Sequence, residues 1–100
     1  MKIIKRNGSE AVFDISKIIA AVTKANNVVA SNQRLTKEQI TAIADDVAQE
    51  CQSRNHAMNV EEIQDLVEDA IMQTNAYEVA RKYITYRYVQ SLKRQTNTTD

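Results

Sequence analysis

The side chains in this sequence best suited to bind a ligand are cations near its beginning. Lys5 and Arg6 stand directly before Asn7-Gly8, and Lys17 follows ten residues later. Phosphate groups bind where positive charge and hydrogen-bond donors come together. A lysine in the first turn of a helix opposes the helix dipole, which mildly favours a partner anion there. These residues therefore indicate an anion-binding site.

A second candidate for phosphate recognition lies near the end of the chain, where Arg87 stands among tyrosines. Arginine interleaved with tyrosine can stack on a base and pair with a phosphate. The spacing of Tyr83 and Tyr86 is, however, more typical of the edge of a hydrophobic core with solvated hydroxyl groups. Lys5 can likewise pair with Glu10 across a hairpin. The residues alone leave both interpretations open.

The charges are unevenly distributed although the net charge is zero. Residues 1–37 and 81–100 are basic, whereas residues 38–80 contain ten acids and only one cation, Arg54. Either these segments complement one another within the fold, or the two basic ends converge on an anionic ligand. The neutral total argues against a general nucleic-acid binder, which usually has a basic excess.

Catalytic and metal chemistry find little support in the composition. The single histidine, His56, lies in a polar stretch and is interpreted as exposed, and Cys51 lies on an apolar helical stripe as a core residue. One Cys and one His cannot build a structural zinc site, and one glycine excludes a P-loop or a Rossmann fingerprint. The acids of residues 61–69 are expected on a solvated helix face. We therefore expect no catalytic residues and no metal ligands.

The chain length and the cysteine content suit a single domain in a reducing compartment. One hundred residues are enough for one hydrophobic core. The sequence has no apolar run long enough to span a membrane and no signal-peptide pattern. A single cysteine fits a reducing setting, so we expect a cytoplasmic protein with no membrane partner.

The sequence predicts a short hairpin followed by four helices. Asn7-Gly8 is typical of a two-residue type I′ turn, which would pair Ile4 with Ala11 and Ile3 with Val12. Met58 is expected to add a third strand, because a hairpin alone is marginal.

Capping patterns mark where the helices begin. Asp14 is expected to cap the first helix, and Thr36 with Gln39 forms a capping box for the second. Asn59 is expected to cap the third, and the fourth is predicted from Asn75 to about Leu92.

Three segments of the sequence resemble an ATP-cone domain, over residues 2 to about 92. The opening resembles the family at residues 3–8 and 13–18, the third helix at residues 60–68, and the closing helix at residues 79–87. The ending, residues 86–88 followed by 93–100, resembles the exit from the cone in anaerobic ribonucleoside-triphosphate reductases.

This resemblance implies a fold and a function. The fold is α+β and mainly α: a four-helix bundle capped by a small N-terminal hairpin or three-stranded sheet. The function is that of a regulatory domain in which ATP turns a reductase on and dATP turns it off. Residues 1–93 would form the nucleotide-binding domain, and 94–100 a polar linker toward an absent catalytic domain. The implied partners are adenine nucleotides, the rest of the reductase chain and other copies of the domain.

The resemblance also assigns roles to individual residues. Lys5, Arg6 and Lys17 would meet phosphates or ribose, and Gln64 with Arg87 would close the phosphate end. Ile3, Phe13 and Ile18 would wall the adenine, and Asp14 would accept from its amino group. Magnesium would arrive only with the triphosphate. The implied nucleotide-binding residues are Ile3, Lys5, Arg6, Asn7, Gly8, Phe13, Asp14, Lys17, Ile18, Val60, Gln64 and Arg87.

Departures from the family pattern and rival interpretations remain open. Asn7 stands where the family usually has Asp, and Gln64 stands where some members have His. The rivals are the cone of another reductase class or of a nucleotide-sensing repressor, a helical docking module without ligand, and an ATP-hydrolysing enzyme. A repressor normally carries a zinc ribbon before its cone, and none is expected before Met1-Lys2 here. The hydrolase lacks a P-loop and a credible base.

Overall fold

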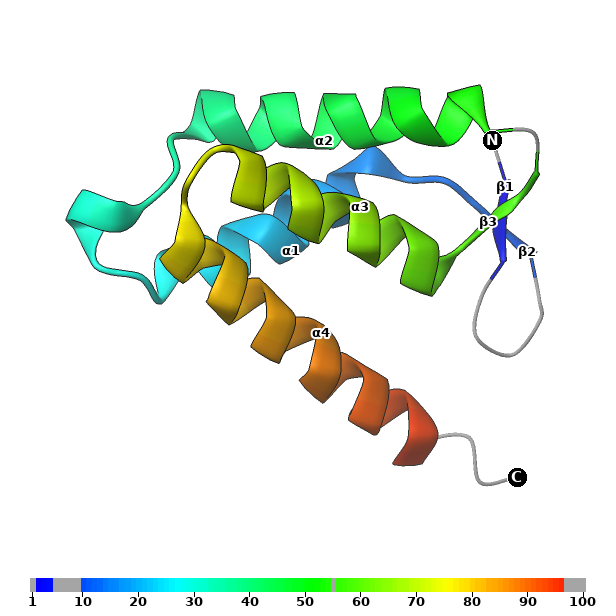
Figure 1. The fold of residues 1–100 in the computed structure, drawn as a ribbon. Coiled ribbons are helices and arrows are strands. Elements are labelled where there is room, and N and C mark those ends of the chain that lie inside the picture. Colours follow the sequence, from blue (N-terminus) through cyan, green and yellow to red (C-terminus); the bar gives the residue numbers. More distant parts are fainter. Residues whose placement is uncertain (1, 5–9, 55, 97–100) are drawn as a thin grey trace.

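The computed structural model describes residues 2–4, 10–54 and 56–96 of the chain. Four α-helices pack into a bundle over these residues, and a small sheet lies against one end of it (Figure 1). The predicted fold class is confirmed. The elements in chain order are β1 (Lys2–Ile4), β2 (Glu10–Val12), α1 (Ile15–Asn27), a 3₁₀ turn (Ser31–Gln33), α2 (Lys37–Ser53), β3 (Met58–Asn59), α3 (Val60–Gln73) and α4 (Tyr77–Thr96).

The sheet has the strand order β2-β1-β3, with β2 antiparallel and β3 parallel to β1. The third strand at Met58 is thus confirmed. Ile3 pairs with Ala11, so the predicted pairing of Ile3 with Val12 is wrong by one residue. Ile3 also lies beside Met58, which is fully buried, and packs against the core. Packing on the core decides the register of such short strands, and a turn signal alone does not.

Side-chain caps begin the first three helices where the sequence predicts them. Asp14 accepts a hydrogen bond from the Ser16 amide, and Asn59 accepts one from the Glu62 amide. Thr36 and Gln39 form the reciprocal capping box. These groups satisfy amides that would otherwise lack a partner inside the helix.

Helix α4 differs from its prediction at both ends. Asn75 has a positive φ of 65° and follows the end of α3, so the predicted cap at Asn75 is wrong and α4 begins at Tyr77. Asparagine tolerates this left-handed conformation better than most residues and commonly follows a helix end. The helix continues to Thr96, past the predicted end near Leu92 and into the predicted polar tail.

One contiguous core holds the bundle together. Its largest fully buried side chains come from every helix but α2, and include Val22, Val67, Ile71 and Val79. Cys51 is buried among them, as predicted, and burial raises the pKa of its thiol. The buried side chain of Asn26 donates to the Leu35 carbonyl and accepts from the Leu35 amide, which fixes the connection between α1 and α2. Among the described residues, no helix is long and apolar enough to cross a membrane.

The capping box offers a direct test of how α2 is held. Thr36→Ala removes the acceptor of the Gln39 amide, so we expect the free energy of unfolding to fall by about 1 kcal/mol. Thr41→Ala is the matched control, because Thr41 lies exposed inside the same helix and only bonds back to a helix carbonyl. Its effect should stay within about 0.5 kcal/mol in urea denaturation. Equal losses in the two variants would contradict the assignment.

Candidate functional site

Apart from Arg87, the described residues among the predicted binding residues lie in β1, directly after β2, or in the first two turns of α1 and α3. These elements meet at the sheet end of the bundle (Figure 1). The first edge of the sheet is strand β2, where Val12 pairs with Lys2 and the chain continues through Phe13 and Asp14 into α1. The second edge is strand β3, where Asn59 pairs with Ile4 and the chain passes directly into α3. A ligand that touches both edges must therefore be elongated.

Three of the residues expected around a base lie in the central strand β1 or follow the edge strand β2 in the chain. Ile3 and Phe13 are half-buried and pack against the core cluster, which leaves part of each side chain exposed. Ile18 lies one turn into α1 and is itself buried in the core. A partly exposed apolar surface beside a helix start is suited to an aromatic ring.

The start of α1 combines a cation in its first turn with a carboxylate at its cap. Its first turn contains no acid, and Lys17 is exposed there. Asp14 uses Oδ1 to accept from the Ser16 amide at 3.0 Å and from the Ser16 hydroxyl at 2.6 Å. These hydrogen bonds hold the pKa of Asp14 below its ordinary value. Asp14 is therefore ionised at neutral pH and able to accept a further hydrogen bond.

The second edge carries the residues expected at the phosphate end. Val60 and Gln64 are half-buried and lie one turn apart at the start of α3. The first turn of α3 also contains Glu61 and Glu62, which offset the positive end of its helix dipole. Lys5, Arg6, Asn7 and Gly8 lie outside the described residues.

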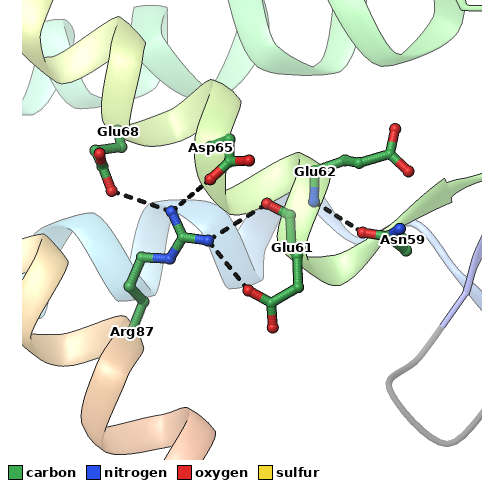
Figure 2. Close-up of polar contacts among 6 residues, drawn as sticks. All are labelled: Asn59, Glu61, Glu62, Asp65, Glu68 and Arg87. Carbon is green, nitrogen blue, oxygen red and sulfur yellow. Dashed lines mark hydrogen bonds and ion pairs between the residues drawn. The ribbon is translucent and has the colours of Figure 1, made fainter.

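Arg87 reaches from α4 to α3 and is surrounded by carboxylates there (Figure 2). Its guanidinium bonds Asp65 at 2.8 Å, Glu68 at 3.0 Å and Glu61 at 3.1 Å, and it contacts the Glu61 carbonyl at 3.4 Å. Only 15% of the Arg87 side chain is exposed. Burial alone would lower the pKa of Arg87, but the bonds to these carboxylates outweigh burial and raise it.

The carboxylate cluster changes what Arg87 can do. Three carboxylates face one guanidinium, so a phosphate approaching this cluster would meet net negative charge. The acids of α3 were predicted to form a solvated face, and the side chains of Glu61 and Asp65 are 50% and 68% exposed on it. Glu68 is partly covered, with 24% of its side chain exposed. The bonds from Arg87 to these three acids were not predicted. Their spacing of four and three residues places all three on one helix face, which was a readable signal. The predicted contact of Arg87 with phosphate stays a prediction.

The tyrosines near Arg87 form the edge of the core, as their spacing predicts. Tyr83 is buried, and burial raises the pKa of its phenol well above the usual range. Its ring lies 6.3 Å from that of half-buried Tyr86, and the ammonium of Lys24 lies 5.9 Å from the Tyr86 ring centre. Both rings therefore serve packing between α1 and α4.

His56 is exposed, as predicted, and also joins the segment before β3 to the first turn of α3. Its Nε2 lies 3.0 Å from Oε2 of Glu62. This hydrogen bond is the main reason that the pKa of Glu62 lies below its ordinary value. The contact ties together two segments that meet at the second edge of the sheet.

Acid should weaken the fold through two carboxyl groups at this end. The folded-state pKa values of Asp14 and Glu62 are depressed, so their contribution is complete above the unfolded pKa, near 4, and is lost as the pH falls through the folded values. We expect Glu62→Gln to lose less stability between pH 6 and about pH 3 than the parent chain in urea denaturation. Asp69→Asn is the matched control, since Asp69 is an exposed acid of the same helix. A parent-like pH profile for Glu62→Gln would contradict this account.

Comparison with known proteins identifies the family. The family model described as the ATP cone domain matches residues 1–92. The chain belongs to the ATP-cone family. This ATP-cone is 37% identical over 94 residues to an anaerobic ribonucleoside-triphosphate reductase of Haemophilus influenzae, which covers 93% of the chain and 13% of that protein.

Other relatives of this ATP-cone are reductases of different kinds. It is 29% identical, over its whole length, to the ribonucleoside-diphosphate reductase subunit alpha of Chlamydia trachomatis, of which it spans 10%. It is 34% identical to the vitamin B12-dependent ribonucleoside-diphosphate reductase of Thermoplasma acidophilum over 86% of the chain and 11% of that protein. The chain thus spans about a tenth of the length of these relatives.

Proposed function

We propose that this ATP-cone is the overall-activity switch of an anaerobic ribonucleotide reductase, which ATP turns on and dATP turns off. The observation that carries the proposal is the family match over residues 1–92. The similarity to an anaerobic reductase over 93% of the chain supports the reductase class. The domain itself is regulatory, and the reaction belongs to the rest of the reductase chain.

The arrangement at the sheet suits an elongated ligand with an apolar and an anionic end. The base lies at the first edge, between Ile3 and Phe13, and Asp14 accepts from the adenine amino group. The triphosphate extends toward the second edge, where Lys5 and Arg6 bind its oxygens. Lys17 contacts ribose or phosphate from the start of α1. Asn7, Gly8, Ile18 and Val60 complete the site.

Gln64 and Arg87 close the phosphate end in different ways. Gln64 contributes a neutral donor from α3, one turn after Val60. Arg87 acts through α3, because its guanidinium already holds Glu61, Asp65 and Glu68. Magnesium enters with the triphosphate and needs no carboxylate of the domain.

The switch requires that ATP and dATP prefer different states of the domain, since equal affinities would shift nothing. The two ligands differ by one hydroxyl, and a coupling of about 1–3 kcal/mol is typical of such switches. We propose that helices beside the site shift with the ligand, and that this changes how cones or whole subunits associate.

Isothermal titration calorimetry with four nucleotides tests the proposal. We expect ATP and dATP to bind with micromolar or tighter dissociation constants, and GTP and dCTP to bind at least about tenfold more weakly. Titrations with and without magnesium show whether the ion enters with the triphosphate. Failure of both adenine nucleotides to bind would overturn the proposal, and steady release of phosphate would point to an ATP-hydrolysing enzyme.

A further inference from the structure

The outward face of α4 is apolar although no element of the described chain covers it. Its apolar side chains are between 39% and 63% exposed, and they recur at helical spacing over the second half of the helix. We call this surface the α4 face. It consists of Ile84, Tyr88, Val89 and Leu92, with the exposed cations Arg81, Lys82 and Lys93 beside them.

The charges of the α4 face are almost all positive. Arg81 forms an ion pair with Glu78, one turn before it. Lys82 and Lys93 have no carboxylate partner among the described residues. Two α4 faces packed against each other would bring like charges together, which costs free energy. The surface that best complements the α4 face is therefore acidic.

Such a surface exists on the opposite side of the same domain. A groove of about 570 Å³ runs between α2 and α3, which pack side by side (Figure 1). Its lining includes the small or apolar side chains of Ala42, Leu66 and Ala70. Its acidic rim consists of Asp46, Glu50 and Asp69.

The rim is chemically complementary to the α4 face. Glu50 is paired with Arg54, but Asp46 and Asp69 have no cation partner within the described part of the chain. No Lys or Arg lines the groove among the residues described. Two unpaired acids on one surface thus match two unpaired lysines on the other.

The dimensions of the two surfaces also agree. The α2 side of the groove extends from Gln39 to Glu50, twelve residues whose ends are about 16 Å apart along the helix. The α4 face extends from Arg81 to Leu92, also twelve residues and about 16 Å. A helix can lie in the groove because Ala42 and Ala70 present almost no side-chain bulk.

We propose that the α4 face of one copy of this chain docks in the α2–α3 groove of a second copy. In Figure 1 α2 runs along the top of the bundle and α4 along the bottom, so the two surfaces of one copy cannot meet each other. Each copy has one of each surface, and the contact is head-to-tail. Repetition of such a contact gives a ring or an open chain of copies. This contact rests on the association of cones proposed above and gives it two specific surfaces. It forms without nucleotide.

Sedimentation velocity of the 100-residue chain over a range of concentrations tests the contact. We expect the mean mass to rise above one chain with concentration, and to fall when salt is added, because exposed charges are screened. Lys82→Glu with Lys93→Glu should weaken association by about tenfold or more, and Asp46→Lys with Asp69→Lys should do the same. Each double variant alone should therefore sediment as a monomer.

Mixing the two double variants gives the sharpest result. The acidic α4 face of the lysine variant then meets the basic groove of the aspartate variant. The unchanged basic α4 face of the aspartate variant likewise meets the unchanged acidic groove of the lysine variant. The mixture should therefore associate again. The controls are Lys37→Glu and Asp45→Lys, which change exposed charges outside both surfaces and should leave association unchanged.

Three results would overturn the head-to-tail contact: a monomeric parent chain at every concentration, association that survives reversal of Asp46 and Asp69, or a mixture that stays monomeric.

Circular dichroism confirms that each variant is folded. Tyr88→Glu, at an exposed position, tests the α4 face without altering the groove and should also weaken association. Calorimetry with ATP is read separately, so failure of this contact and failure of nucleotide binding are distinguishable.

Discussion

Replacement of both Lys5 and Arg6 by alanine is expected to weaken ATP binding by about 100-fold or more while the domain stays folded. A hydrogen bond to a charged group contributes about 1.5–3 kcal/mol, and the proposal assigns at least one such bond to each side chain. The measurement is calorimetric titration with ATP, together with a thermal melt of each variant. The melting temperature should change little, because charged side chains beside a turn are expected to contribute little to a hydrophobic core.

The matched control removes the same amount of charge elsewhere. Lys24→Ala with Lys37→Ala takes away two exposed cations, one in the last turn of α1 and one in the first turn of α2. Its affinity for ATP should stay within about threefold of the parent, since only long-range attraction is lost. Equal losses in the two double variants would mean that net charge, and no specific contact of Lys5 or Arg6, drives binding.

Arg87→Ala is expected to lower the free energy of unfolding by about 2 kcal/mol. Removing one partner of a fully buried ion pair costs about 3–5 kcal/mol, but Asp65 and Glu61 are half or more exposed, so water screens part of the loss. The three carboxylates of α3 would then repel one another. Adding Glu68→Gln, at the least exposed of the three acids, should restore part of the stability.

Urea denaturation measures this effect, and Arg81→Ala is its control. Arg81 forms an exposed ion pair within α4, so its removal should cost less than about 1 kcal/mol. ATP titration of folded Arg87→Ala separates the two roles of the arginine. If Arg87 acts only by holding α3 in place, its removal should reduce the affinity for ATP much less than the Lys5 and Arg6 double replacement does. An equal loss would instead place Arg87 directly on the phosphates.

Local signals in the sequence were enough to place most elements. Caps at Asp14, Thr36 and Asn59 act within three residues, so their patterns could be read without the fold. The predicted helix cap at Asn75 was wrong because asparagine is common at two different places in proteins. Asparagine both caps helices and tolerates positive φ, and only the packing of α3 against α4 decides between these uses.

Features that join distant segments were harder to predict. The central strand β1 pairs with β2 and also with β3, whose Met58 lies opposite Ile3 although it is 55 residues away in the chain. The bonds of Arg87 to α3 span 19 to 26 residues and require the antiparallel helix pair. For the binding residues, Ile3 lies in β1, and Phe13 and Asp14 connect β2 to α1, so local signals were enough to place them in the chain. Their role in nucleotide binding stays a prediction.

The most direct test of the central claim is a titration of the ¹⁵N-labelled chain with ATP, followed by two-dimensional NMR. Nucleotide binding at the sheet predicts large changes in the backbone amide signals of Ile3, Phe13, Asp14 and Lys17. The signals of Gln33, in the 3₁₀ turn, and of Asn75, between α3 and α4, should stay in place, because these two segments lie at the opposite end of the bundle (Figure 1). A spectrum that ATP leaves unchanged, or changes centred on Gln33 and Asn75, would contradict the account.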